Sequence, residues 1–176
     1  MASDPLFQRP KPQAYVSYDH KKDGAYFDLC LRLFGSVCDM TRDRSLEREL
    51  GADGPEAHIR ALLADPMAAT RCTLVLCGAN THLDPFVDWE IKATLDKYAG
   101  LIAVALPGVP EGPSGTPILP ARLQDNFDGG YAVLCNWRDL VDGRIDLTHR
   151  IAFAIARNPE QVLNGRPLLG FPSALQ

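Results

Sequence analysis

The sequence has no excess of positive charge and no long apolar run. Its 18 lysine and arginine residues stand against 22 aspartate and glutamate residues, which gives a formal net charge of -4. This balance offers no basic stripe for a phosphate backbone, so nucleic acid is not an expected partner. No window approaches the roughly 20 apolar residues that span a bilayer, and residues 1–13 contain no apolar signal core. We therefore expect a cytoplasmic protein without a membrane partner.

Disulfide and metal-binding motifs are also missing. The five cysteines include no Cys-x-x-Cys pair, and the four histidines lack the spacing of metal ligands. Most of the cysteines lie in apolar runs, which is typical of small buried side chains in a reducing compartment. The cysteines in these runs are Cys30, Cys72, Cys77 and Cys135. The sequence therefore predicts neither a disulfide framework nor a metal site.

The chain length fits one domain with short segments on either side of it. A chain of 176 residues can bury a five-stranded sheet covered by helices, but not two full domains. Residues 1–13 contain three prolines among polar residues and predict an extended lead-in. We expect the domain to cover residues 14–157 and to be followed by an irregular tail, residues 158–176.

Apolar runs alternate with helical spacing along the chain, which predicts a parallel α/β sheet. The runs that predict strands are residues 14–18, 72–77, 101–106 and 131–137. The segments that predict helices end at Gly35, open at Pro55, open at Pro85 and surround Ile151. Residues 37–54 carry mixed charges and are interpreted as a long surface loop. Right-handed crossovers between such strands give a flavodoxin-like three-layer sandwich with about five strands.

The stretch from Arg71 to Ile91 is the centre of this arrangement. An apolar run ends at Gly78, and Asp84-Pro85 then provides a helix N-cap followed by a proline at the first helical position. Phe86 and Glu90 are four residues apart and share one helix face. The neighbouring stripe, predicted to dock on the sheet, is Val87, Ile91, Leu95 and Tyr98. Glu90 is thus expected at the core margin, near the carboxyl end of a strand, where doubly wound sheets bind ligands.

Two segments resemble the bacterial TIR-like domains, in particular the TIR-like subunit of the Thoeris anti-phage system. They are AYVSYDHKKD at residues 14–23 and CTLVLCGANTHLDPFVDWEIKATLDK at residues 72–97. The first strand ends in Ser-aromatic, and the helix has the form aromatic-Val-x-aromatic-Glu-Ile at residues 86–91. The resemblance covers roughly residues 14–137.

This resemblance implies an enzyme that consumes NAD. Active members of the family cleave the bond between nicotinamide and ribose and often cyclise the product into a signalling ADP-ribose isomer. Their essential acid is the helix glutamate, which corresponds to Glu90. The implied partners are NAD, as substrate rather than cofactor, a second copy of the chain on activation, and a separate effector that the small-molecule signal reaches.

The same resemblance suggests which side chains hold the nucleotide. Glu90 would stabilise an oxocarbenium-like ribose, although a helical glutamate is also commonly a solvated surface residue. The aromatic residues Tyr15, Tyr18 and Phe86 can stack on a flat ring, but the two tyrosines also fit a core role with a hydrogen-bonded hydroxyl. Polar groups at the strand ends can bind ribose or phosphate, or satisfy a turn; these are Ser17, Asn80 and Thr81.

One alternative function remains open from the sequence. A TIR-like interaction module would need the same fold and surface contacts, but no catalytic acid.

The proline- and glycine-rich segment Pro107–Pro120 suits neither strand nor helix. We expect it at the same sheet edge as Glu90, where it would meet the nucleotide or a second copy of the chain.

Overall fold

The computed structural model describes residues 10–42 and 54–171, which form a five-stranded, all-parallel sheet with helices on both faces. The strands are β1 (Gln13–Tyr18), β2 (Asp39–Thr41), β3 (Cys72–Cys77), β4 (Gly100–Ala105) and β5 (Val133–Asn136). The helices are α1 (Gly24–Phe34), α3 (Gly54–Ala64), α4 (Pro85–Asp96), α5 (Ala121–Asp128), α6 (Trp137–Val141) and α7 (Leu147–Ile155). Two 3-10 turns are η2 (Thr81–Leu83) and η3 (Pro159–Gln161).

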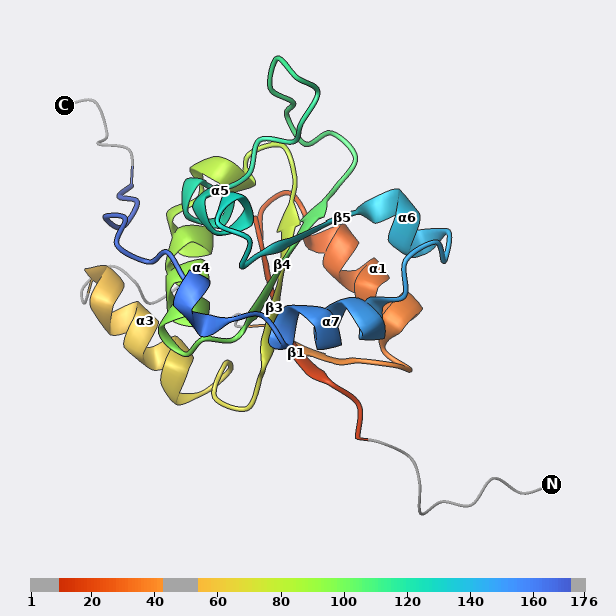
Figure 1. Ribbon diagram of the computed structural model, residues 1–176, viewed down its shortest axis with the longest axis horizontal. Helices are drawn as coiled ribbons and strands as arrows, with labels where there is room; N and C mark the ends of the chain where they lie inside the picture. Colours follow the sequence, from red (N-terminus) through yellow and green to blue (C-terminus); the bar gives the residue numbers. More distant parts are fainter. Residues whose placement is uncertain (1–9, 43–53, 172–176) are drawn as a thin grey trace.

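The layers confirm the predicted flavodoxin-like α/β sandwich. Helices α3, α4 and α5 lie on one side of the sheet and α1, α6 and α7 on the other (Figure 1). The strand order is β2-β1-β3-β4-β5. The chain therefore leaves β1 outward to β2 and then returns to β3, which makes the β1/β3 boundary the topological switch point. Ligands of open α/β sheets bind beyond the carboxyl ends of the strands at such a point.

The two faces of β1 face different parts of the core, as its alternating sequence predicted. Ala14, Val16 and Tyr18 pack with residues of α1, α6 and α7. Tyr15 packs on the opposite face with residues of α3 and α4. Strand pairing aligns Ser17 with Val75 of β3, which places both strands' carboxyl ends at one edge. The sequence thus sends Tyr15 and Ser17 to the α4 side of the sheet.

The central strand and helix have the predicted bounds, with one correction at the end of the helix. The Asp84 side chain accepts a hydrogen bond from the Phe86 backbone N–H at 2.9 Å, so the predicted N-cap forms. The spacing predicted that Tyr98 would join the buried stripe of α4, and this prediction was wrong. The helix ends at Asp96, and Tyr98 lies beyond it with φ of 55° and 60% of its surface exposed.

Residues 37–54 were predicted to form a surface loop, and this prediction was wrong where the edge strand β2 lies. This strand has three residues and, within the described part of the chain, β1 is its one neighbour, so it needs few apolar anchors and leaves little periodic signal. The remainder, residues 43–53, lies outside the described residues. The Leu31 side chain, predicted to face inward from α1, is instead 39% exposed.

All five cysteines are buried and unpaired, as their apolar surroundings predicted. Burial raises the pKa of Cys30 to about 12 and that of Cys38 to about 11. Both thiols therefore stay protonated at neutral pH and act as small core side chains rather than nucleophiles.

The predicted irregular tail, residues 158–176, begins with the 3-10 turn η3, and residues 162–171 then run back along α4 and α5 without a helix or strand (Figure 1). We call residues 162–171 the C-terminal strap. The proposed limits of the domain, residues 14–157, stay a prediction. Among the described residues, every helix is too short or too polar to cross a bilayer.

Candidate active site

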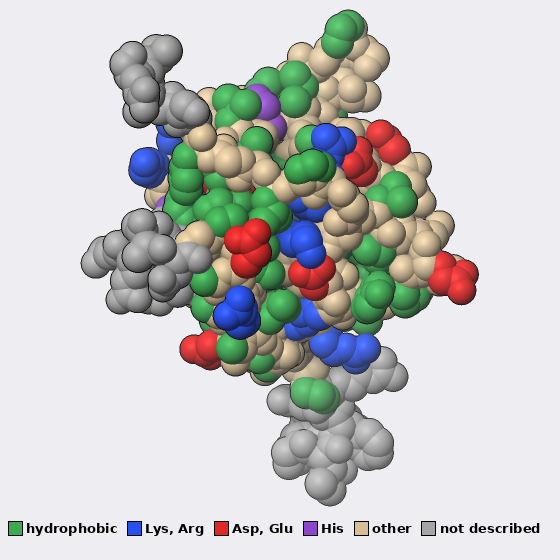
Figure 2. All heavy atoms as spheres, turned by 90° about the vertical axis from the view of Figure 1, so that its left-hand side faces the viewer, with side chains coloured by type: hydrophobic (Ala, Val, Ile, Leu, Met, Phe, Trp, Pro, Cys, Tyr) green, Lys and Arg blue, Asp and Glu red, His purple; other side chains and the backbone are tan. Residues whose placement is uncertain are grey.

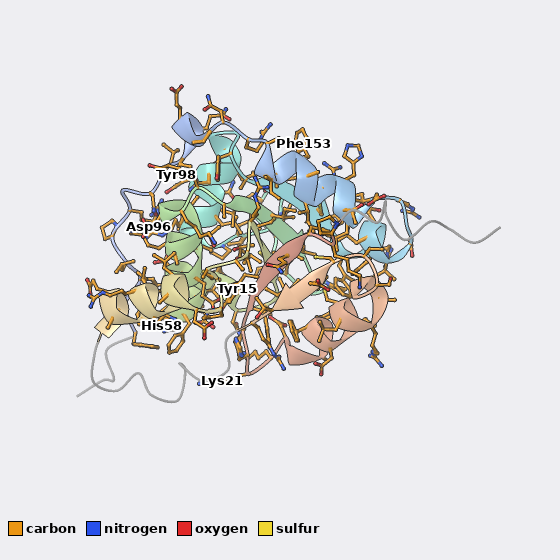
Figure 3. All side chains as sticks on the ribbon, turned by 90° about the horizontal axis from the view of Figure 1, so that it is seen from below. Tyr15, Lys21, His58, Asp96, Tyr98 and Phe153 are labelled. Carbon is orange, nitrogen blue, oxygen red and sulfur yellow. The ribbon has the colours of Figure 1, made fainter. Side chains whose placement is uncertain are left out.

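Glu90 is buried in the second turn of α4, with its carboxylate held by two hydroxyl groups from β1. The Tyr15 hydroxyl donates to Glu90 Oε1 at 2.5 Å, and the Ser17 hydroxyl donates to Oε2. Glu90 is only 4% exposed, and Tyr15 and Ser17 are fully buried. Figure 3 shows Tyr15 in the interior of the molecule, and His58 on α3. Tyr15, Ser17 and Glu90 thus form one hydrogen-bonded cluster.

Burial of a carboxylate is costly, so its hydrogen-bond partners decide what it can do. The two O–H donors offset part of the hydration that Glu90 loses, and they fix the plane of the carboxylate. A threonine hydroxyl also joins α4 to the sheet. The Thr94 hydroxyl donates to the Glu90 backbone carbonyl at 2.8 Å, and its oxygen lies 2.7 Å from the Thr73 hydroxyl oxygen of β3. The result is a carboxylate with a fixed position relative to the sheet.

Aromatic rings surround this end of α4. Phe86 and Trp89 meet edge to face with ring centroids 5.2 Å apart, and His58 lies 5.6 Å and 5.5 Å from them. Phe171 of the C-terminal strap packs on Phe86 at 5.2 Å and on Trp89 at 5.6 Å. Trp89 is 3% exposed and is therefore a packing residue in this structure.

A cavity of about 420 Å³ opens beside this cluster at the switch point. Its size is within the range of small-molecule sites. Phe86 lines the cavity and lies one helical turn before Glu90, whereas the Glu90 side chain itself is not in the cavity wall. The lining residues come from the β1–α1 loop, the β3–α4 loop, the start of α4 and the strap: Asp19, His20, Lys21, Asn80, Leu83, Asp84, Pro85, Phe86 and Phe171.

Five of the six predicted substrate-binding residues fall into three groups. Asn80 and Phe86 line the cavity, and Tyr15 and Ser17 contact Glu90 beneath the surface. Tyr18 lies on the opposite face of β1, where it stacks on His20 at 4.2 Å and on Phe27 at 5.3 Å. In this structure, the rings of Tyr15 and Tyr18 are therefore both buried core side chains, which is the alternative to a stacking role. Ligand binding by any of these residues stays a prediction.

Thr81 satisfies the turn that follows β3. Its hydroxyl accepts a hydrogen bond from the Gly78 N–H at 2.8 Å and lies within reach of the Asp23 carboxylate and the Leu76 carbonyl. A Cβ on Gly78 would come within 2.3 Å of Asp23 Oδ2, so a larger residue at this close approach would have to displace the Asp23 carboxylate. The Thr81 side chain thus satisfies the backbone of the turn, which is the alternative to binding ribose or phosphate.

Of the nine residues in the cavity wall, the sequence analysis proposed Asn80 and Phe86 as binding residues and missed the others, among them His20, Lys21 and Phe171. His20 and Lys21 follow the first strand directly, and their position at a strand's carboxyl end was a usable signal. Phe171 lies 81 positions after Glu90 in an irregular segment, and no local pattern connects it to the site. Figure 3 shows Lys21 at the margin of the molecule.

Two carboxyl groups at this edge of the sheet, those of Asp23 and Asp84, have raised pKa values. Burial, and then the charge of Asp19, raise the pKa of Asp23 above its ordinary value. Burial likewise raises the pKa of Asp84, against the hydrogen bond from the Phe86 N–H. The described residues contain no cluster of three or more potential metal ligands.

The pKa of Asp23 predicts a specific pH dependence of stability. A carboxyl whose pKa is higher in the folded than in the unfolded chain binds more protons when folded, so the free energy of unfolding falls as pH rises through that window. We expect Asp23→Asn to gain stability relative to the wild type as pH rises from about 4 to about 7. Melting temperatures measured across this range check the prediction.

Asp146, the N-cap of α7, provides the control. The hydrogen bonds from Thr148 and His149 lower its pKa, so its contribution to stability is present above the unfolded pKa and is lost in acid. Asn also caps helices well, so Asp146→Asn should lose stability relative to the wild type as pH rises through the acid range to about 4, and should follow the wild type from there to pH 7. Parallel trends in the two variants would contradict the assignment for Asp23.

The sheet order defines a doubly wound α/β domain, and the buried carboxylate beside a cavity at the switch point marks a candidate ligand site at its strand ends. A family model described as "Thoeris protein ThsB, TIR-like domain" matches residues 15–111, which is more than half of the chain. The chain therefore belongs to this family of Thoeris TIR-like domains, as the resemblance predicted. No curated protein matches the chain. The matched region contains Tyr15, Ser17 and Glu90 and ends before α5 and the strap.

Proposed function

We propose that the protein cleaves the nicotinamide–ribose bond of NAD and releases a cyclic or conjugated ADP-ribose signal that activates a separate effector in Thoeris anti-phage defence. The observation that carries this proposal is the buried Glu90 carboxylate, fixed by the Tyr15 and Ser17 hydroxyls beside a ligand-sized cavity. Membership in the Thoeris TIR-like family supports the defence role.

The chemistry needs a fixed negative charge near the ribose. As the bond between ribose C1′ and the nicotinamide nitrogen breaks, both electrons go to the nitrogen, and neutral nicotinamide leaves. The ribose then carries an oxocarbenium-like positive charge, which a carboxylate in a low-dielectric site stabilises. A nucleophile within the same molecule, or a second molecule, bonds to C1′ and releases a proton. Glu90 would stabilise the cation, and the β1 hydroxyls would hold Glu90 in position.

The cavity has the composition that a nucleotide needs. Phe86 provides an aromatic wall, and Asn80 provides amide donors and an acceptor. Lys21 brings a positive charge that suits a phosphate group. NAD enters as the substrate, and the proposed reaction needs no other cofactor.

Glu90 also separates this proposal from a purely structural interaction module. Such a module needs the fold and an exposed surface, but gains nothing from a carboxylate that burial destabilises. Buried carboxylates beside cavities are concentrated at functional sites. The burial of Glu90 at 4% exposure therefore favours the enzyme over the module.

The test is release of nicotinamide from NAD by the purified protein. We expect release when the protein is supplied with extract from phage-infected cells, and a smaller rate without it. Nicotinamide is separated by chromatography and identified by its mass. If the folded protein leaves NAD intact in both arms, the interaction-module alternative is supported instead.

A hydroxyl deletion on β1 tests the positioning of Glu90. Tyr15→Phe keeps the buried ring and removes only the donor to Glu90 Oε1, so we expect turnover to fall on the order of tenfold. Tyr131→Phe is the matched control, because the Tyr131 hydroxyl donates to the Ala99 carbonyl at 2.8 Å on another part of the sheet. Both variants lose a buried hydrogen bond, worth about 1 kcal/mol. Equal turnover in the two variants would rule out a positioning role for Tyr15.

The Pro107–Pro120 segment supports a role in assembly. It projects beyond the carboxyl ends of the strands (Figure 1), and a bridge between Glu111 and Pro117 folds it back on itself. Proline restricts such a loop before binding, so little entropy is lost when it docks. We assign it to contact with the nucleotide or with a second copy of the chain during activation.

A further inference from the structure

The C-terminal strap is fastened to the domain by a buried arginine. Arg122 of α5 is fully buried and forms an ion pair with Asp88 of α4 at 2.9 Å and 3.2 Å. The same guanidinium donates to the Asn164 side chain and to the backbone carbonyls of Arg166 and Pro167. One cation therefore joins two helices and three positions of the strap.

Further hydrogen bonds extend this attachment along the strap. The Asn126 side chain donates to the Leu163 carbonyl and accepts from the Leu163 N–H, at 2.8 Å and 2.9 Å. The Leu169 N–H donates to Asp88 Oδ2, and the Leu169 carbonyl accepts from Trp89 Nε1, both at 2.9 Å. Hydrogen bonds to α4 and α5 thus hold the strap backbone from Leu163 to Leu169, two residues before Phe171.

The surface around the strap carries charged side chains among apolar ones. Figure 2, which views the side that carries α3, α4 and the strap, shows acidic and basic side chains interspersed across its centre. Arg166 and Asp125 form a two-bonded ion pair there, and Lys92 pairs with Asp96. The strap is therefore held by specific polar contacts.

This attachment delivers Phe171 to the wall of the candidate cavity. One part of its ring packs on Phe86 and Trp89, yet 54% of the residue remains exposed. The other cavity residues include Asn80 and Lys21. An anchored ring that stays half exposed beside polar groups is suited to a ligand with a flat ring and an anionic group.

We propose that Phe171 is a substrate-binding residue whose ring stacks on a flat ring of NAD and forms, with Phe86, an aromatic wall of the site. The inference rests on the proposed function. Phe171 lies outside residues 15–111, the part of the chain that the family model matches. The strap thus adds to the family's domain a specificity element that comes from the end of the chain.

Equilibrium binding separates this role from catalysis. NAD is titrated by calorimetry into the full chain carrying Glu90→Gln, which binds the dinucleotide without consuming it. We expect the added substitution Phe171→Ala to weaken NAD binding roughly tenfold, because a stacked ring is lost, and Phe171→Tyr to restore it. Leu169→Ala is the control: it shortens another half-exposed side chain of the strap and keeps both backbone hydrogen bonds.

The outcomes distinguish the two proposals. Weaker binding by Phe171→Ala, with the affinity kept in Leu169→Ala and an unchanged melting temperature, supports the stacking role. NAD affinity that is equal or higher in Phe171→Ala overturns that role and leaves the proposed function standing. If the Glu90→Gln protein does not bind NAD, the titrations are repeated in the wild-type background, and a wild-type protein that does not bind NAD overturns both.

Discussion

A Glu90→Gln protein will fold normally and lose NAD turnover by ~10²-fold or more. Glutamine keeps the shape of the side chain, and the Tyr15 and Ser17 hydroxyls can donate to its oxygen or accept from its amide. The substitution removes the negative charge opposite the developing ribose cation, and loss of such a group costs on this order in rate. Initial rates of nicotinamide release measure the effect.

The matched control for this result is Glu56→Gln. Glu56 is an exposed residue in the first turn of α3 and does not line the cavity. Both substitutions change the net charge equally, so a general electrostatic effect would lower both rates. Full turnover in a folded Glu90→Gln protein would refute the catalytic assignment.

Substitution of Arg122 will have the largest effect on stability. Arg122→Ala leaves Asp88 buried at 7% side-chain exposure without its cation and removes the donor to the strap carbonyls. Breaking a buried ion pair by removal of one partner costs about 3–5 kcal/mol. We expect the free energy of unfolding in urea to fall by this amount.

Arg166→Ala shows what an exposed ion pair is worth in the same region. Arg166 and Asp125 pair at 2.8 Å, but their side chains are 43% and 34% exposed. Exposed pairs contribute about 0–1 kcal/mol, because solvent screens them. If Arg122→Ala were no more destabilising than Arg166→Ala, the buried network would not be what fixes the strap.

The parts of the fold that the sequence predicted correctly are those with strong local signals. Strand β3 is a continuous apolar run that ends in glycine, and α4 begins with an aspartate cap and Pro85. Each signal depends on neighbouring residues alone, so it can be read without the tertiary structure. The same holds for the alternation along β1, which sent Tyr15 and Ser17 toward Glu90.

The parts that the sequence analysis missed depend on contacts between distant residues. Helix α5 has only three buried positions, and two of them are Arg122 and Asn126. An apolar periodicity is therefore absent, because partners in α4 and in the strap satisfy these polar side chains. Strand β2 is short and lies at the sheet edge, so it too lacks a periodic pattern.

The centre of the candidate site was easier to predict than its rim. The resemblance and the spacing in α4 pointed to Glu90, and Tyr15 and Ser17 were proposed as nucleotide-binding residues; their hydrogen bonds to Glu90 were not predicted. Tyr18 was grouped with them because it ends the same strand, but a one-residue step turns its side chain to the other face. Phe171 reaches the rim only through the strap, whose path no local rule specifies.

Product analysis of an NAD digest tests the central claim most directly. The wild-type protein and Glu90→Gln are each incubated with NAD and infected-cell extract, and the products are resolved by mass spectrometry. For the wild type we predict nicotinamide and an equal amount of an ADP-ribose product, the cyclic form being lighter than ADP-ribose by one water molecule. For Glu90→Gln we predict intact NAD. Intact NAD from the wild type, or the same products from both proteins, would contradict the account.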